Sequence, residues 1–147
     1  MTLSADQAYG AAAAEIIAER SQAVFAQRHG VLDMTDIERV HRMRVATRRL
    51  RAALEVFGPA MRGRRYRRAL HEVKALADAL GERRDRDVQL ERLERLAART
   101  SGAERHAVEL LMAELVREQR EANGELKRAL RHAKRTGLRR RLARLSR

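Results

Sequence analysis

The sequence contains no cysteine and only one proline, Pro59. Without cysteine the chain can form neither a disulfide framework nor a thiolate metal site. Aromatic residues account for only 3% of the chain, and β-branched residues are also scarce, so little in the composition favours strands. Alanine, leucine, arginine and glutamate dominate instead, and all four are strong helix formers. The composition therefore predicts an all-α fold.

Long apolar runs are missing as well. No segment approaches the 18 consecutive apolar residues that a membrane-spanning helix needs. The first 20 residues lack a basic stretch followed by an apolar core, so we expect no secretory signal. With 147 residues, 44% of them apolar and 36% charged, the chain has the size and composition of one globular domain. These features predict a cytoplasmic protein with no membrane partner.

Acidic residues are nearly absent from two stretches of the chain. Residues 39–74 contain twelve Lys and Arg but two acids, and residues 127–147 contain ten Lys and Arg but no acid. The formal net charge is +13, although the rest of the chain is net acidic. Positive charge that is segregated in this way indicates a polyanionic partner or an anionic surface.

Glycines and capping signals divide the chain into the four to five helices of an antiparallel helical bundle. The expected helices cover about residues 5–29, 35–57, 61–80, 86–99 and 102–136. Three capping boxes support these starts: Ser4 with Gln7, Thr35 with Glu38, and Ser101 with Glu104.

Two connecting or terminal segments are expected to be irregular. The charged stretch 82–87 follows Gly81 and is predicted to be a turn, with Asp85 as the N-cap of the next helix. Residues 1–137 then form one bundle domain, and residues 138–147 form a basic tail that is predicted to be a disordered arm. The arginines of that arm are Arg139, Arg140, Arg141 and Arg144.

The stretch 39–57 combines an apolar seam with a basic row. Its apolar positions recur at spacings of three and four residues and are Val40, Met43, Thr47, Leu50, Leu54 and Phe57. Beside this seam His41, Arg44, Arg48 and Arg51 follow the same spacing. A row of guanidinium groups on a rigid helix suits phosphate, because each planar fork of donors matches phosphate oxygens. A solvated face that covers apolar neighbours is the ordinary alternative, although such a face would normally include acids at i,i+4.

The next basic row repeats this design. In the helix expected at 61–80, the basic residues Arg64, Arg67, His71 and Lys74 flank an apolar seam. If this helix packs antiparallel to the one before it, the two basic flanks are expected to face each other across a groove. In the last long helix the basic residues repeat at heptad-like intervals, and they are Arg117, Arg120, Lys127, Arg131 and Lys134.

Two segments of the sequence resemble the signature of the CHAD family, the conserved histidine α-helical domain. The stretch HRMRVATRRLRAALEVF at 41–57 is similar to the family pattern His–x–x–Arg–Val–Ala–x–Arg–Arg–Leu–Arg followed by an aromatic residue. The stretch LGERRDRDV at 80–88 is similar to the family element Leu-Gly–x–x–Arg-Asp–x–Asp-Val. The resemblance covers about residues 5–135.

The resemblance implies non-catalytic binding of inorganic polyphosphate along a basic helical surface, and association with polyphosphate granules. Matched by position, the implied binding residues of the first segment are His41, Arg44, Arg48, Arg49 and Arg51. Lys74 stands where the family has a basic residue in the helix before Leu-Gly, and Arg84 with Asp85 matches the Arg-Asp pair.

One departure from the family pattern leads to a further expectation. A complete member is roughly twice this long and has two similar helical bundles, whereas this sequence contains no second copy of the signature. We therefore expect a two-fold homodimer that completes the basic surface, since two-fold association is the commonest kind. A reduced monomeric form with a shallower site is the other interpretation.

Other functions fit the sequence less well. Weak, nonspecific nucleic-acid binding would use the same charge, but only four aromatic residues are present to stack on bases. An enzyme acting on polyphosphate would need clustered carboxylates for a metal or a glycine-rich phosphate loop, and neither pattern occurs. His41 and His71 can each serve as phosphate donors or as packing residues, and Asp85 and Asp87 are interpreted as a cap and an ion-pair partner. We expect no catalytic residue, no metal and no cofactor.

Overall fold

The computed structural model describes residues 4–61 and 63–147, and these residues form α-helices without any strand. The helices are α1 (Ala5–Ala26), α2 (Glu38–Phe57), α3 (Arg64–Ala97), α4 (Gly102–Thr136) and α5 (Leu138–Leu145), with a short 3₁₀ helix η1 (Gly58–Ala60) between α2 and α3. The predicted all-α bundle is confirmed. Residues 1–3 of the expected bundle, and Arg62 of the helix expected at 61–80, lie outside the described residues.

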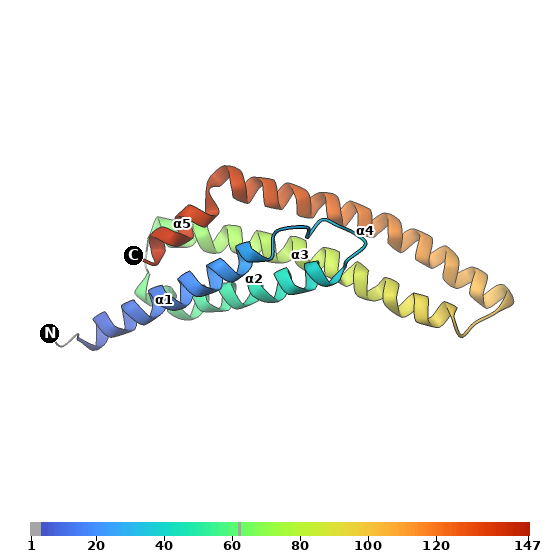
Figure 1. Cartoon of the computed structure of the whole chain (residues 1–147), viewed down its shortest axis with the longest axis horizontal. Helices are drawn as coiled ribbons and strands as arrows, with labels where there is room; N and C mark the ends of the chain where they lie inside the picture. Colours follow the sequence, from blue (N-terminus) through green and yellow to red (C-terminus); the bar gives the residue numbers. More distant parts are fainter. Residues whose placement is uncertain (1–3, 62) are drawn as a thin grey trace.

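The helices pack mainly against their neighbours in the chain, as Figure 1 shows. α1 lies beside α2, α2 beside α3, and α3 runs antiparallel to α4 along most of their lengths. α3 and α4 are much longer than α1 and α2, so one end of the molecule is a two-helix hairpin. α5 turns back from the end of α4 and packs on α1 and α3.

The core lies where α1, α2 and α3 meet α5 and the second half of α4. Apolar residues at spacings of three and four supply it from each helix, as the periodicity predicts. The fully buried members include Ile17, Val24, Val40, Met43, Leu50, Leu54, Val73, Leu80, Leu126, Leu138 and Leu142. Thr47 is buried among them, and its hydroxyl donates a hydrogen bond of 2.8 Å to the carbonyl of Met43. The seam of α2 therefore fixes which side of that helix remains available to solvent.

The charged stretch 82–87 is helical, so the predicted turn is wrong. α3 continues through Gly81 to Ala97 without interruption. The charges pair within the helix at i,i+4: Arg83 Nε lies 2.9 Å from Asp87 Oδ1, and Arg86 Nη1 lies 2.5 Å from Glu82 Oε2. Such pairs favour the helix, and an internal glycine lowers its stability only modestly.

The start of α2 also differs from the prediction. Thr35 does not cap it; the N-cap residue is Ile37, which makes no side-chain capping bond. Thr35 instead donates from its backbone nitrogen and its hydroxyl to Asp33 Oδ1, at 2.9 and 2.7 Å. These two bonds, the hydroxyl first, hold the pKa of Asp33 below its ordinary value. The capping box of Ser4 and Gln7 is present, whereas Ser101 makes no side-chain capping bond.

The expected disordered arm is wrong as well, because residues 138–145 form α5. Leu138 and Leu142 are buried, since their spacing of four puts both on the side that faces the bundle. Arg141 Nη1 lies 2.6 Å from Glu72 Oε2 of α3, and the guanidinium of Arg139 lies 5.6 Å from the ring centre of Phe25. The basic segment is therefore packed on the bundle.

Substituting alanine for a glycine inside α4 and for the glycine that follows it is expected to change stability in opposite directions. Gly137 ends α4 with a left-handed φ of 69°, and a Cβ there costs about 1 kcal/mol. Gly124 lies inside α4 with nothing within 4 Å of an added Cβ, so Gly124→Ala should stabilise by up to about 1 kcal/mol. Urea unfolding measures the change in the free energy of unfolding for each variant. If Gly137→Ala also stabilised the protein, this account of Gly137 would be contradicted.

Candidate functional site: basic side chains along the helices

Three arginines of α2 line a groove between α2 and α3. Arg44, Arg48 and Arg51 lie along one side of it, and the groove encloses about 440 Å³. Ala77 and Gly81 of α3 lie in the same groove, and their small size leaves room for it. Arg48 is exposed and the other two are partly exposed. A bound anion can therefore reach three guanidinium groups that one rigid helix holds in place.

The opposite side of this groove is acidic, which the sequence analysis missed. Asp78, Glu82 and Asp85 line it from α3, at spacings of four and three residues. That spacing was a readable signal, since it places all three carboxylates on one side of a helix. An anion in the groove is attracted along the α2 side and repelled along the α3 side.

Lys74 and Arg51 share a carboxylate at one end of the groove. Glu55 Oε1 lies 3.1 Å from Arg51 Nε and 3.7 Å from Lys74 Nζ. Close by, the hydroxyl of Tyr66 donates a 2.7 Å hydrogen bond to the carbonyl of Leu54. Burial, and secondarily the charge of Glu55, raise the pKa of Tyr66 above its ordinary value. α2 and α3 are thus tied together where the chain turns between them.

The other basic residues of α3 line a second groove, between α3 and α4. Arg64, Arg67 and His71 lie there with Arg68, which the sequence analysis did not single out. His132 and Thr136 of α4 complete the groove, which encloses about 410 Å³. The prediction that the basic rows of α2 and α3 face each other across one groove is therefore wrong. Of the predicted α3 row, Lys74 is the residue that approaches the α2 row.

His41 and Arg49 lie on yet another side of α2. They line a groove of about 350 Å³ between α1 and α2, together with Arg42 and Arg20. The Nδ1 atom of His41 is buried and has no hydrogen-bond partner among the described residues. The signature residues of α2 are therefore divided between the two sides of that helix.

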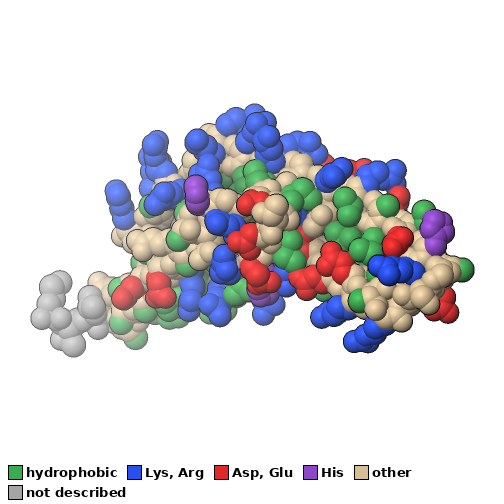
Figure 2. Space-filling model, turned by 45° about the vertical axis from the view of Figure 1, so that its right-hand side comes forward, with side chains coloured by type: hydrophobic (Ala, Val, Ile, Leu, Met, Phe, Trp, Pro, Cys, Tyr) green, Lys and Arg blue, Asp and Glu red, His purple; other side chains and the backbone are tan. Residues whose placement is uncertain are grey.

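The predicted row of α4 is dispersed along that helix. Arg131 and Lys134 line a wide trough between α3 and α4, which encloses about 1120 Å³ and contains Ala75, Ala79 and Ala129. Arg117 is paired with Glu114, and Arg120 and Lys127 are exposed without lining the grooves described above. Figure 2 shows Lys and Arg side chains crowded over one part of the molecule and mixed with acids at the hairpin end.

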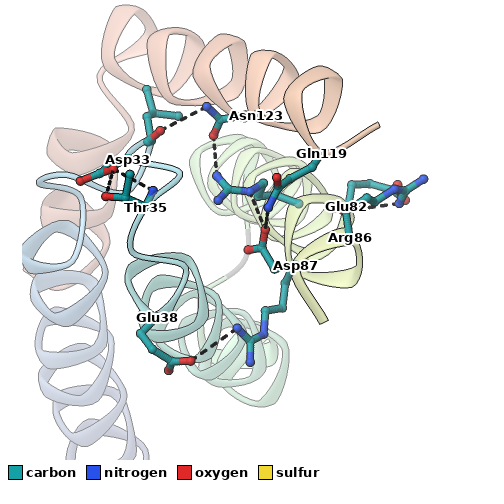
Figure 3. Close-up of polar contacts among 11 residues, drawn as sticks. Asp33, Thr35, Glu38, Glu82, Arg86, Asp87, Gln119 and Asn123 are labelled. Atoms are coloured by element: carbon teal, nitrogen blue, oxygen red, sulfur yellow. Dashed lines mark hydrogen bonds and ion pairs between the residues drawn. The ribbon is translucent and has the colours of Figure 1, made fainter. Parts of the chain in front are cut away.

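A buried polar network holds α3, α4 and the segment before α2 together, as Figure 3 shows. Arg83 is fully buried and binds Asp87 within α3 and Asn123 Oδ1 of α4, the latter at 2.6 Å. Gln119 Nε2 donates to Asp87 Oδ1 at 2.6 Å, and Asn123 Nδ2 donates to the carbonyl of Leu32 at 3.2 Å. The network fixes the position of α3 relative to its neighbours.

Arg84 lies next to this network and points toward α2. Its Nη1 atom lies 3.8 Å from Glu38 Oε1, so Arg84 pairs with the start of α2. The side chain of Arg84 is only 16% exposed, so only a small part of it is accessible to a large anion.

Two further findings concern the described residues only. No group of three His, Asp or Glu side chains in residues 4–61 and 63–147 is arranged to hold a metal ion. Among the same residues, no helix is both long enough and apolar enough to cross a membrane.

The fold and the basic grooves define a helical protein with arginine rows on successive helices. A family model, that of the CHAD domain, matches residues 15–147, and the chain therefore belongs to the CHAD domain family. No curated protein and no solved structure matched the chain.

Proposed function

We propose that this protein binds inorganic polyphosphate without catalysis, through basic side chains on α2, α3 and α4. The observation that carries the proposal is the row of Arg44, Arg48 and Arg51 along one open groove. The CHAD domain, to which residues 15–147 belong, is associated with polyphosphate binding. The other proposed contacts are His41, Arg49, Arg64, Arg67, His71, Lys74, Arg84, Arg117, Arg120, Lys127, Arg131 and Lys134.

The arginine row suits a polyphosphate chain for two reasons. Successive phosphates each carry about one charge, and the arginines recur at about one helical turn, which gives the chain repeated charge-assisted hydrogen bonds. The core seam beside the row, which includes Met43 and Leu50, already holds α2 in place. Little conformational entropy of the backbone is therefore lost on binding.

The acidic side of the groove supports a thin ligand. Asp78, Glu82 and Asp85 repel an anion that fills the groove from wall to wall. An unbranched phosphate chain can follow the arginine side alone, with counter-cations between it and the carboxylates.

Nonspecific nucleic-acid binding is the second candidate, and it rests on the same positive charge. Its weakness is the small number of rings available for stacking on bases. Phe57 and Tyr66 are partly buried, and the half-exposed ring of Tyr9 already lies against Phe57, with ring centres 5.5 Å apart. Discrimination between these two ligands is thus the first test of the proposal.

Calorimetric titration in about 150 mM salt compares polyphosphate of defined length with a single-stranded oligonucleotide of equal charge. We expect tighter binding of polyphosphate, and affinity that rises with chain length until the arginine row is filled. If four phosphates are neutralised, affinity should fall about 50-fold between about 50 and 200 mM salt, since counterion release governs such binding. Equal affinity for the two ligands would overturn the selectivity proposed here.

Two finer proposals accompany this function. The first is that the protein associates with polyphosphate granules, where the ligand is concentrated. The second is that it forms a homodimer, so that two basic surfaces act on one polyphosphate chain and raise its apparent affinity.

A further inference from the structure

The hairpin end of the molecule is only two helices thick. The bond from Asn123 to the carbonyl of Leu32, and the ion pair of Arg84 with Glu38, mark the level at which α2 begins. Beyond that level, over about residues 88–118, α3 and α4 pack against no other helix of the described residues, as Figure 1 shows. A helix in such a pair buries one side, and its other apolar residues remain in water.

Three leucines of this hairpin are left exposed. Leu96 of α3 is 45% exposed, and Leu110 and Leu111 of α4 are 61% and 57% exposed. Leu93 beside them is only partly buried. Several large apolar side chains left exposed at one end of a molecule mark an interaction surface more often than a single one does.

The leucines continue the trough between α3 and α4 described above. Eighteen residues make about five full helical turns, so Leu93 stands on the same side of α3 as Ala75, and Leu111 on the same side of α4 as Ala129. Ala75 and Ala129 both line the trough. The trough itself is also lined by charged side chains, among them Asp78, Glu82, Arg128 and Arg135. We therefore give the name α3–α4 strip only to the hairpin part of this side, and its residues are Leu93, Leu96, Leu110 and Leu111.

Charge selects what can cover this strip. Residues 88–118 contain five Arg and six acids, whereas the rest of the chain contains 28 Lys and Arg against 14 acids. Two pairs along the hairpin satisfy one another, Arg105 with Glu109 at 3.2 Å and Arg117 with Glu114. Two copies that met through any strongly basic part would repel each other, but the hairpin is almost neutral.

We propose that two copies of this chain associate through their α3–α4 strips, which face each other across a two-fold axis. An apolar strip of this kind complements itself, and two-fold contacts use the same patch on both partners. The leucines of one hairpin then cover those of the other, and the basic row of α2 on each copy stays accessible. This proposal gives the contact surface of the homodimer that the proposed function includes. It rests on the homodimer and does not require polyphosphate binding.

The test is the mass of the protein in solution without polyphosphate, measured by light scattering and sedimentation velocity over about 1–100 µM, the range that separates weak from stable association. We expect a dimer for the natural sequence and a monomer for Leu96→Glu/Leu111→Glu. The control is Val56→Glu, which places one such carboxylate on a comparably exposed apolar position of α2, 64% exposed, and should remain a dimer. A monomeric natural protein, or a double variant that stays dimeric, would overturn the proposal.

A second measurement covers the case in which the double variant does not fold, which circular dichroism would reveal. The chain has no cysteine, so a single introduced thiol reports contacts without background. Leu111→Cys should form a covalent dimer on mild oxidation, whereas Ala52→Cys, on the exposed side of α2, should not. The reverse pattern would show that the copies meet elsewhere.

Binding of polyphosphate to the same variants separates this proposal from the proposed function. A dimer that does not bind polyphosphate would refute the proposed function and would still support dimerisation through the α3–α4 strip. A monomer that binds polyphosphate tightly would refute the dimer and would still support polyphosphate as the ligand.

Discussion

Replacing Arg44 and Arg48 of α2 by alanine is expected to weaken polyphosphate binding by about 100-fold or more. Both side chains line the α2–α3 groove, and no salt bridge within the described residues engages either of them. Each guanidinium can therefore give its full set of donors to phosphate oxygens. A hydrogen bond to a charged group contributes about 1.5–3 kcal/mol, so two lost contacts amount to a factor of about 100 to 20,000.

The matched control for this variant removes two arginines from the hairpin end. Arg95 and Arg99 are both exposed; Arg95 lies in the last turn of α3 and Arg99 just beyond its end, far from the groove. Arg95→Ala/Arg99→Ala therefore produces the same change in net charge. We expect its affinity for polyphosphate to fall by less than about tenfold, through the loss of long-range attraction alone. Calorimetry of both variants at one salt concentration gives the comparison. Equal losses would mean that total charge, and not the arginine row, determines binding.

Removing the carboxylate of Asp87 is expected to destabilise the protein more than any other single side-chain truncation proposed here. Asp87 is 1% exposed, and it accepts hydrogen bonds from Arg83 and from Gln119. Asp87→Ala leaves the fully buried guanidinium of Arg83 without its counter-charge. Breaking a buried pair in this way costs about 3–5 kcal/mol. For a domain of this size the melting temperature should fall by about 10 °C.

Two controls show whether burial is the cause. Glu109→Ala breaks the pair with Arg105, whose side chains are more than half exposed, and should change the free energy of unfolding by less than about 1 kcal/mol. Arg83→Met/Asp87→Leu removes both charges and should recover part of the loss, because no unpaired charge remains buried. Thermal unfolding of the three variants measures these differences. A double replacement as unstable as Asp87→Ala alone would contradict the assigned role of the ion pair.

Periodicity alone predicted α2 and the arginines beside its seam. The spacing of Val40, Met43 and Leu50 defines the buried side, and all three are buried. The same spacing then places Arg44 and Arg48 next to that side, where the groove lies. The local pattern was sufficient here because, in a helix, the spacing between two residues determines whether they lie on the same side.

The pattern failed for residues 82–87 because the partners that stabilise them there are distant in sequence. Gln119 and Asn123 come from α4, and no local rule connects them with Arg83 and Asp87. A glycine followed by alternating charges is typical of a turn, and only the buried network and the i,i+4 pairs show otherwise. For the same reason residues 138–145 were predicted to be a disordered arm, because α5 is stabilised by contacts with α1 and α3 that are distant in sequence.

The position of the α3 basic residues was predictable in principle. In an antiparallel pair, residues equally distant from the connection lie opposite each other. The connection between α2 and α3 is centred near residue 61, so Arg44 must face the region near Asp78 and not Arg64 or Arg67. Counting outward from the connection would have revealed the acidic side of the groove.

The contact between α5 and α1 has a consequence for how the chain folds. α1 with α2, α2 with α3, and α3 with α4 join segments that are close in sequence, and such local contacts form quickly. α5 joins α1 across more than 100 residues, and it needs the surfaces of α1 and α3 to exist before Leu138 and Leu142 can be buried. We therefore expect the amides of α5 to gain protection from hydrogen exchange after those of α2 and α3, so that its docking completes the folding reaction.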